Sequence, residues 1–200
     1  MRKISKTFLS LLTSTTVVLS MAQSPGAVPQ IRRVVTSVDS AGKAVVLFDD
    51  KVDMSSLRSP NPAGDMWVTQ QFPLNFSAKE DLAKTKVGVS PGKNGTLFRI
   101  VDFVPTTEKI EKLPVDTMMK IVGDNVPKRG MPPRHSMMHR TRTVDYALVL
   151  SGEIDMLLDD TEVHLKEGDV VVQQASNHAW VNRGSKNCRV AFILMDSQEP

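Results

Sequence analysis

Apolar and polar residues alternate in short runs through the last third of the chain, between residues 138 and 196. The strongest run, 144–150, is rich in aliphatic and β-branched side chains and ends at Ser151 and Gly152, which predicts a buried strand followed by a tight turn. Successive side chains of a strand point to opposite faces. The pattern therefore predicts one face with Asp145, Ala147 and Val149 and another with Tyr146, Leu148 and Leu150.

Further runs of the same kind follow along the chain, separated by residues that favour turns. They predict strands at 154–158, 163–165, 170–173, 178–182 and 189–195. No helical periodicity lies between these runs. Several short strands in close succession predict an antiparallel sandwich or barrel.

Upstream of this region the strand signals are more widely spaced. Residues 31–38 and 43–48 predict a hairpin joined by a turn at 39–42. The remaining expectations are a loop at 51–64, a short strand at 66–70, irregular chain at 75–95 and a strand at 96–103.

A long connection, residues 104–134, precedes the strand-rich region. It predicts a short helix at 115–122, followed by irregular chain at 128–133 that is rich in Pro and Gly. Connections of this length are usually functional or mobile. Two interpretations stay open here, a lid across the barrel mouth and a surface decoration.

The N-terminal residues 1–22 have the pattern of a secretory signal peptide, with a basic start, an apolar centre and small residues at the end. Residues 23–30, with two prolines and a glycine, predict a flexible tether. The folded part is then a single domain at 31–200, and the protein is expected to be secreted or periplasmic. If translation instead begins at Met21, the location would be cytoplasmic.

The charge balance changes when this leader is set aside. The chain has 25 basic and 22 acidic residues, and three of the basic residues lie in the leader. The remainder has equal numbers of both, so no charge excess points to nucleic acid or an anionic membrane. The apolar leader run is also too short to span a bilayer. The single cysteine, Cys188, cannot form an internal disulfide.

Two spaced motifs carry the chemistry of the strand-rich region. The first has His139, Thr141, Asp145 and Gly152, spaced H-x-T-x3-D-x6-G. The second comprises Gly168, Gln173, Ala175, His178 and Asn182. There is no phosphate-binding Gly loop, nucleophile elbow or paired cysteine that would indicate another chemistry.

These motifs resemble those of the cupins, whose patterns are G-x5-H-x-H-x3,4-E-x6-G and G-x5-P-x-G-x2-H-x3-N. Thr141 stands where the second His would be, and Asp145 stands in the Glu place. Gln173 and Ala175 replace the Pro and Gly, and one residue is missing after Gly168. The wider pattern resembles a single-domain subgroup from bacteria and fungi, some of whose fungal members are cupin-domain oxidoreductases among polyketide-tailoring enzymes.

The resemblance implies an all-β fold, a double-stranded β-helix (jelly-roll) barrel with its motif core at 138–196, an N-terminal hairpin and a short helical insertion. It also implies a metal-dependent oxidoreductase for a small organic substrate, such as an aromatic or polyketide-derived one. Two other functions stay open, a metal-free cupin that binds a small molecule without turnover and an isomerase or lyase. Cupin barrels commonly form dimers by pairing strand edges, so a homodimer through the hairpin is a further expectation.

The metal ligands that the resemblance implies are His139, Asp145 and His178, with His135 as an additional candidate. Iron, manganese, zinc and nickel are all compatible with such a set. Asp is one methylene shorter than Glu, so Asp145 must reach further. In the alternative, His178 makes only a structural hydrogen bond, Asp145 pairs with a neighbouring arginine and His135 is solvated.

Four residues near these ligands are candidates for contact with substrate. Arg140 and Arg142 could present a basic fork to a carboxylate or phenolate, or lie on the barrel rim as ordinary surface charges. Tyr146 and Trp180 could line the pocket or fill the core. Asn182, like Thr141, Gly152 and Gly168, is expected to have a structural role.

Overall fold

The computed structural model describes residues 28–55, 61–74, 80–85, 87–112, 114 and 134–198. The predicted leader, most of the tether, the helix expected at 115–122 and the irregular chain at 128–133 lie outside these residues. Within them, no helix is long and apolar enough to cross a bilayer.

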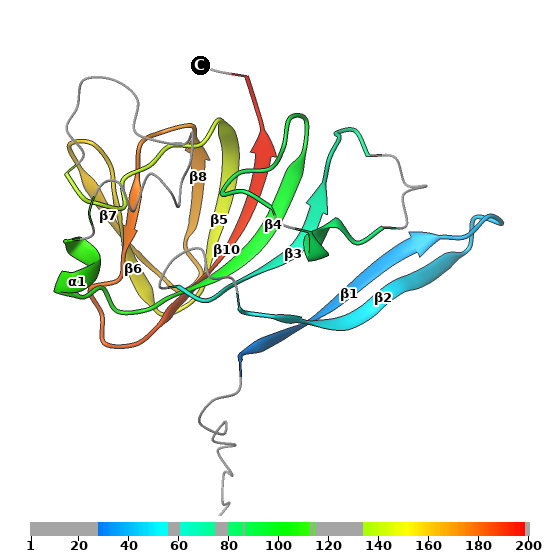
Figure 1. Ribbon diagram of the computed structural model, residues 1–200, viewed down its shortest axis with the longest axis horizontal. Coiled ribbons are helices and arrows are strands. Elements are labelled where there is room, and N and C mark those ends of the chain that lie inside the picture. The colour runs from blue at the N-terminus through cyan, green and yellow to red at the C-terminus, as the bar shows by residue number, and fades with distance from the viewer. Residues whose placement is uncertain are drawn as a thin grey trace, which may run out of the picture.

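Nearly all the regular structure is β, which confirms the predicted fold class (Figure 1). The strands are β1 (Gln30–Val38), β2 (Ala44–Asp53), β3 (Ala63–Thr69), β4 (Thr96–Phe103), β5 (Thr143–Ser151), β6 (Glu153–Leu157), β7 (Glu162–Lys166), β8 (Val170–Gln174), β9 (Ala179–Val181) and β10 (Cys188–Asp196). Two short helical turns, η1 (Leu82–Lys84) and α1 (Glu108–Glu111), complete the described elements.

The strands form three antiparallel sheets, a five-stranded sheet in the order β3-β4-β10-β5-β8, a three-stranded sheet in the order β7-β6-β9, and the hairpin β1-β2. The main core lies between the first two sheets. It contains Ala147, Val149 and Val190 from the larger sheet and Ile154, Met156, Leu165 and Trp180 from the smaller one, together with Cys188. The alternation in β5 is as predicted, because Asp145, Ala147 and Val149 are buried and Tyr146, Leu148 and Leu150 are exposed.

Two expectations from the sequence need correction. The predicted loop at 51–64 is shorter, because β2 continues to Asp53, which lies opposite Gln30, and β3 already begins at Ala63. In addition, β9 begins at Ala179, and His178 takes part only in an isolated bridge.

The hairpin β1-β2 forms an arm that projects away from the two packed sheets (Figure 1). At its base, Ile31 and Val52 pack against a cluster formed by Met54, Met66, Ile100 and Ala191. Arg33 holds the arm against the body at this junction. Its guanidinium donates hydrogen bonds to Asp50, Asp81 and the carbonyl oxygen of Met66 at 2.6–3.1 Å. Its side chain is buried, and the hydrogen bonds to the two carboxylates raise its pKa.

The outer face of the five-stranded sheet is covered on one half only. The base of the arm packs over Ile100 and Ala191, whereas no described element covers the half made by β5, β8 and the end of β10. Its large apolar side chains are 39–63% exposed: Tyr146, Leu148, Leu150, Val170, Val172 and Ile193. A contiguous apolar face of this kind usually marks a contact with another molecule.

Replacing Arg33 by Ala should destabilise the protein by about 3–5 kcal/mol, because two carboxylates then lie beside the junction without their cation. The adjacent Arg32 is the matched control, since it pairs with Asp49 in solvent and Arg32→Ala should leave the urea midpoint nearly unchanged. Equal losses in the two variants would contradict the anchoring role of Arg33.

We propose the open sheet face as a second candidate surface, beside the strand edges of the hairpin, for the homodimer expected from the sequence. We expect the double substitution Leu148→Glu, Val172→Glu to convert a dimer into a folded monomer, measured by light scattering and circular dichroism. Val163→Glu, on the exposed side of β7, is the control. A monomeric unsubstituted protein, or a dimer that survives the double substitution, would refute this assignment.

Candidate functional site

Two histidines from the two motifs meet at one point of the barrel. His139 and His178 form an antiparallel bridge in which each backbone N–H donates to the other residue's carbonyl oxygen at 2.9 Å. Their ring centroids are 4.3 Å apart, with the planes inclined by 50°. The structure therefore brings together two of the predicted site residues that are 39 positions apart in the chain.

The imidazole of His139 is held in a single tautomer. Its Nδ1 lies 2.9 Å from the carbonyl oxygen of Met137. A carbonyl can only accept, so Nδ1 carries the proton and Nε2 presents a lone pair. Burial lowers the pKa of His139, which keeps the ring neutral near neutral pH.

His178 is more deeply buried, and its Nδ1 has two neighbours. The carbonyl oxygen of Ser176 lies at 3.0 Å and the side-chain amide nitrogen of Gln173 at 2.9 Å. Nδ1 can donate to the first or accept from the second, but not both, so the tautomer of His178 depends on the orientation of the Gln173 amide. Burial, and then the proximity of His139, lower its pKa well below the ordinary value.

Asp145 points into the barrel from β5 and is only 5% exposed. Its Oδ2 lies 3.4 Å from the amide nitrogen of Gln173, its cross-strand neighbour in β8. Its Oδ1 is buried and has no hydrogen-bond partner among the described residues. Burial raises the pKa of Asp145 to about 6, although a hydrogen bond with Thr143 acts in the opposite direction.

The predicted three-ligand metal site is not assembled in this arrangement. The Gln173 amide nitrogen contacts both Asp145 and His178. An ion shared by these two residues would need direct contacts with both of them, and the amide lies between them. Within the described ranges, no group of three or more His, Cys, Asp or Glu side chains is arranged to hold a metal ion. The side chains as they stand therefore do not fit a shared ion.

The other metal-related positions agree with this conclusion. Thr141, in the place of a motif histidine, is buried and its hydroxyl accepts a hydrogen bond from that of Thr143 at 2.6 Å. His135 uses Nδ1 to accept the N–H of Met137 within its own loop, and burial lowers its pKa. Metal binding by the chain stays a prediction.

One of the four predicted substrate contacts, Trp180, has its ring packed against a site histidine. Trp180 is buried, with ring centroids 5.3 Å from Phe192 and 6.2 Å from His178, so it joins the core to the site. Tyr146 lies on the opposite face of β5 from Asp145, and its assignment to the same pocket is corrected, because alternate strand residues face opposite ways.

The two arginines differ in position. Arg142 forms an ion pair with Asp196 at 3.0 Å, and its side chain is 46% exposed. It therefore makes a surface pair rather than a partnership with Asp145. Arg140 is partly buried.

The motif residues with expected structural roles shape turns around the site. Asn182 is fully buried, and its amide group bonds the backbone of Phe103, Lys186 and Gly184 at 2.8–2.9 Å. Gly152 has φ +81°, and a Cβ there would lie 3.0 Å from the carbonyl oxygen of Asn187. Gly168 also has a positive φ, of +89°. Thus other residue types would be strained at both turns.

Gln173 is the site residue that sequence reasoning missed. It stood out only as a departure from the proline of the motif. The pairing of β5 with β8 places it opposite Asp145. The sequence does contain a signal for this position. If the two predicted strands are paired antiparallel with their buried faces on the same side, Gln173 comes to lie opposite Asp145.

The comparison with known proteins agrees with this architecture. The family model described as Cupin domain matches residues 125–194. The chain is 45% identical over 184 residues to "Phomopsin biosynthesis cluster protein C'" of Diaporthe leptostromiformis, covering 85% of this chain and 82% of that protein. It is 29% identical over 178 residues to "Cupin-domain-containing oxidoreductase srdD" of Neurospora crassa, covering 85% and 77%. The chain therefore belongs to the cupin family.

The structural likeness to solved proteins is slighter. A putative ethanolamine utilization protein Q from Salmonella typhimurium has 10% sequence identity and a TM-score of 0.40, with 86% of this chain and all of that chain covered. This degree of likeness carries no argument about function.

The pKa of Asp145 makes a prediction about stability. Its folded value of about 6 lies above the ordinary 3.8, so the unfolded chain loses this proton first and stability falls as pH rises through that window. Asp145→Asn removes the effect, so relative to the unsubstituted protein it should gain on the order of 3 kcal/mol between pH ~3.5 and pH ~7.5. Urea unfolding at the two pH values measures this, and a pH-independent difference would contradict the raised pKa.

Proposed function

We propose that the protein is a cupin oxidoreductase that acts on a small organic substrate beside His139, His178 and Asp145. The observation that carries the proposal is the Asp145 carboxyl group, which is buried, has one oxygen without a partner and faces the interior of the barrel. A buried acid of this kind is a candidate functional group, because its desolvation is offset only in part, by contacts with neutral groups.

The other buried carboxylates of the protein sharpen this contrast. Asp102 is paired with Arg189 at 2.6 Å, and Asp155 is paired with Arg183 at 2.6 Å. The contacts of Asp145 are instead with neutral groups, a long one to the Gln173 amide and a hydrogen bond with Thr143. It is therefore the buried acid best suited to exchange a proton with a ligand near neutral pH.

The chain's own residues then have distinct roles. His139 Nε2, with its lone pair, is placed to accept a proton from a substrate hydroxyl group. Asp145 takes up or returns a proton through Oδ1, the oxygen that has no hydrogen-bond partner among the described residues. Trp180 offers an apolar wall for the body of the substrate.

The redox character and the substrate class are supported by the relatives. The Neurospora relative is named an oxidoreductase, and the Diaporthe relative is named for a biosynthesis cluster. The electrons removed from a substrate need an external acceptor, which we take to be molecular oxygen. A divalent metal, as expected from the motif resemblance, would require the Gln173 amide to move away from Asp145 and His178.

A second function, an isomerase or lyase, is favoured by one specific observation. The described side chains around His139 and Asp145 are proton-transfer groups, and Cys188 is buried in the core, where burial raises its pKa to about 11. Proton abstraction and return at neighbouring atoms would need these groups alone.

Oxygen uptake and product mass test the proposal with the purified full chain. A panel of small aromatic alcohols, aldehydes and hydroquinones serves as substrates. We expect turnover with oxygen consumption, and Asp145→Asn and His139→Ala should each reduce it by a factor on the order of 100 or more, as is typical for the loss of an acid–base group. Tyr146→Phe, on the outer face of β5, should retain full activity.

The alternative outcomes are distinguishable in the same experiment. A product isomeric with its substrate and formed without oxygen would establish the isomerase instead. Saturable binding without any product would establish a binding protein. Elemental analysis of protein purified without chelator, repeated for His178→Ala, tests whether these residues hold a metal.

A further inference from the structure

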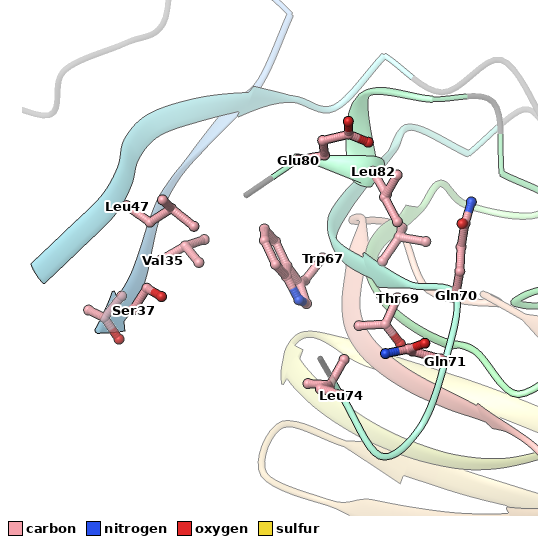
Figure 2. A pocket seen from close by; sticks show the side chains of 12 residues that line it. Val35, Ser37, Leu47, Trp67, Thr69, Gln70, Gln71, Leu74, Glu80 and Leu82 are labelled. Carbon is pink, nitrogen blue, oxygen red and sulfur yellow. The ribbon is translucent and has the colours of Figure 1, made fainter. Parts of the chain in front are cut away.

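A groove separates the β1-β2 arm from the body of the protein, away from the paired histidines. Its cavity volume is ≈ 370 Å³. Figure 2 shows Val35 and Leu47 of the arm on one side, the Trp67 indole in the middle, and Leu82 and Gln70 of the body on the other. Pockets of this size and largely apolar lining are typical of small-molecule sites.

Local backbone geometry aims the arm residues into the groove. Val35 pairs with Phe48, and Thr36 pairs with Val46, so Leu47 is the extra residue of a β-bulge. A bulge redirects the side chains of its strand. Leu47 therefore lines the groove, while Phe48 contacts Trp67 with ring centroids 6.2 Å apart.

The two walls are also held at a fixed separation. Arg33 joins β1 to Asp50 of the arm and to Asp81 of the body, next to the groove. Both contacts are charge-assisted and largely shielded from solvent. The groove is thus preformed, which reduces the entropy cost of binding.

The groove carries a negative charge on its polar side. Among the described residues that line it, Glu80 is the only one with an ionisable side chain. The nearby acids Asp50 and Asp81 are neutralised by Arg33 and Lys84. Glu80 has no such cation, and the side chains of Gln70, Gln71 and Trp67 likewise have no hydrogen-bond partner among the described residues.

We propose that this groove binds a small aromatic amine in its protonated form. The ring packs against the Trp67 indole, between the apolar side chains of Leu47 and Leu82. The ammonium group lies toward Glu80, with the carboxamide oxygens of Gln70 and Gln71 as further acceptors. A carboxylate ligand would meet Glu80 as a like charge, so charge complementarity selects the amine.

Calorimetry with phenethylamine tests the proposal, with phenethyl alcohol as its neutral analogue. We expect saturable binding of the amine with one site per chain. Glu80→Gln should weaken amine binding by about two- to fivefold, the size of an exposed charge pair, and leave the alcohol unaffected. Trp67→Ala should weaken both ligands by about tenfold or more.

Two further variants keep the result interpretable if Trp67→Ala unfolds. Glu80→Lys, at an exposed position, should invert the preference, so that phenylpropanoate binds better than phenethylamine. Glu167→Gln changes an exposed acid outside the groove and should have no effect.

Several outcomes would overturn the assignment. These are the absence of saturable amine binding, equal affinity in Glu80→Gln, and loss of binding in Asp145→Asn, which would place the ligand in the barrel. Occlusion of the groove by a second copy, seen as a dimer that Glu80→Lys dissociates, would also overturn it.

Discussion

The backbone bridge between His139 and His178 is the constraint on which the site depends. His139 precedes β5 of the larger sheet, and His178 precedes β9 of the smaller one, so the two hydrogen bonds join the sheets at one place. With the backbones so close, the two rings cannot separate far, and they lie 4.3 Å apart. Two imidazolium ions at that distance would repel strongly, so burial and proximity together favour the neutral rings.

Charge burial elsewhere in the protein follows a different rule. Arg99 pairs with Asp65, Arg189 with Asp102, and Arg33 with two carboxylates at the arm junction. In each case a planar guanidinium satisfies a carboxylate that the fold has shielded from water. These pairs hold strands in register, whereas the interior around Asp145 contains an amide and imidazoles. The arginine-paired carboxylates therefore have a structural role, whereas Asp145 is the acid proposed to take part in the chemistry.

Much of this architecture could be predicted from alternation and motif spacing. The strand at 96–103 has the predicted bounds, and the buried face of β5 follows from the period of two. The same alternation placed Tyr146 on the face opposite Asp145, which argues against both side chains lining one pocket. The resemblance of the motifs to those of the cupins also implied that His139 and His178 meet.

Other features depend on contacts that a linear pattern does not contain. Arg33 in β1 has the appearance of a surface residue, and its burial depends on Asp81, 48 positions away. The arm projects because its base, rather than its whole length, finds apolar partners. The site also depends on a cross-strand neighbour, Gln173, which lies 28 residues from Asp145 and occupies a position where the family motif has no amide.

The amide of Gln173 links the protonation of Asp145 to the tautomer of His178. When Asp145 is ionised, the amide nitrogen can donate to both Asp145 and His178 Nδ1, so the imidazole proton lies on Nε2. When Asp145 is protonated, the amide oxygen faces both groups instead, His178 Nδ1 donates, and Nε2 presents a lone pair. Burial raises the pKa of Asp145 to about 6, which brings the protonation of this carboxyl group close to neutral pH. A single rotating amide can therefore exchange the donor and acceptor roles of His178 without moving the backbone.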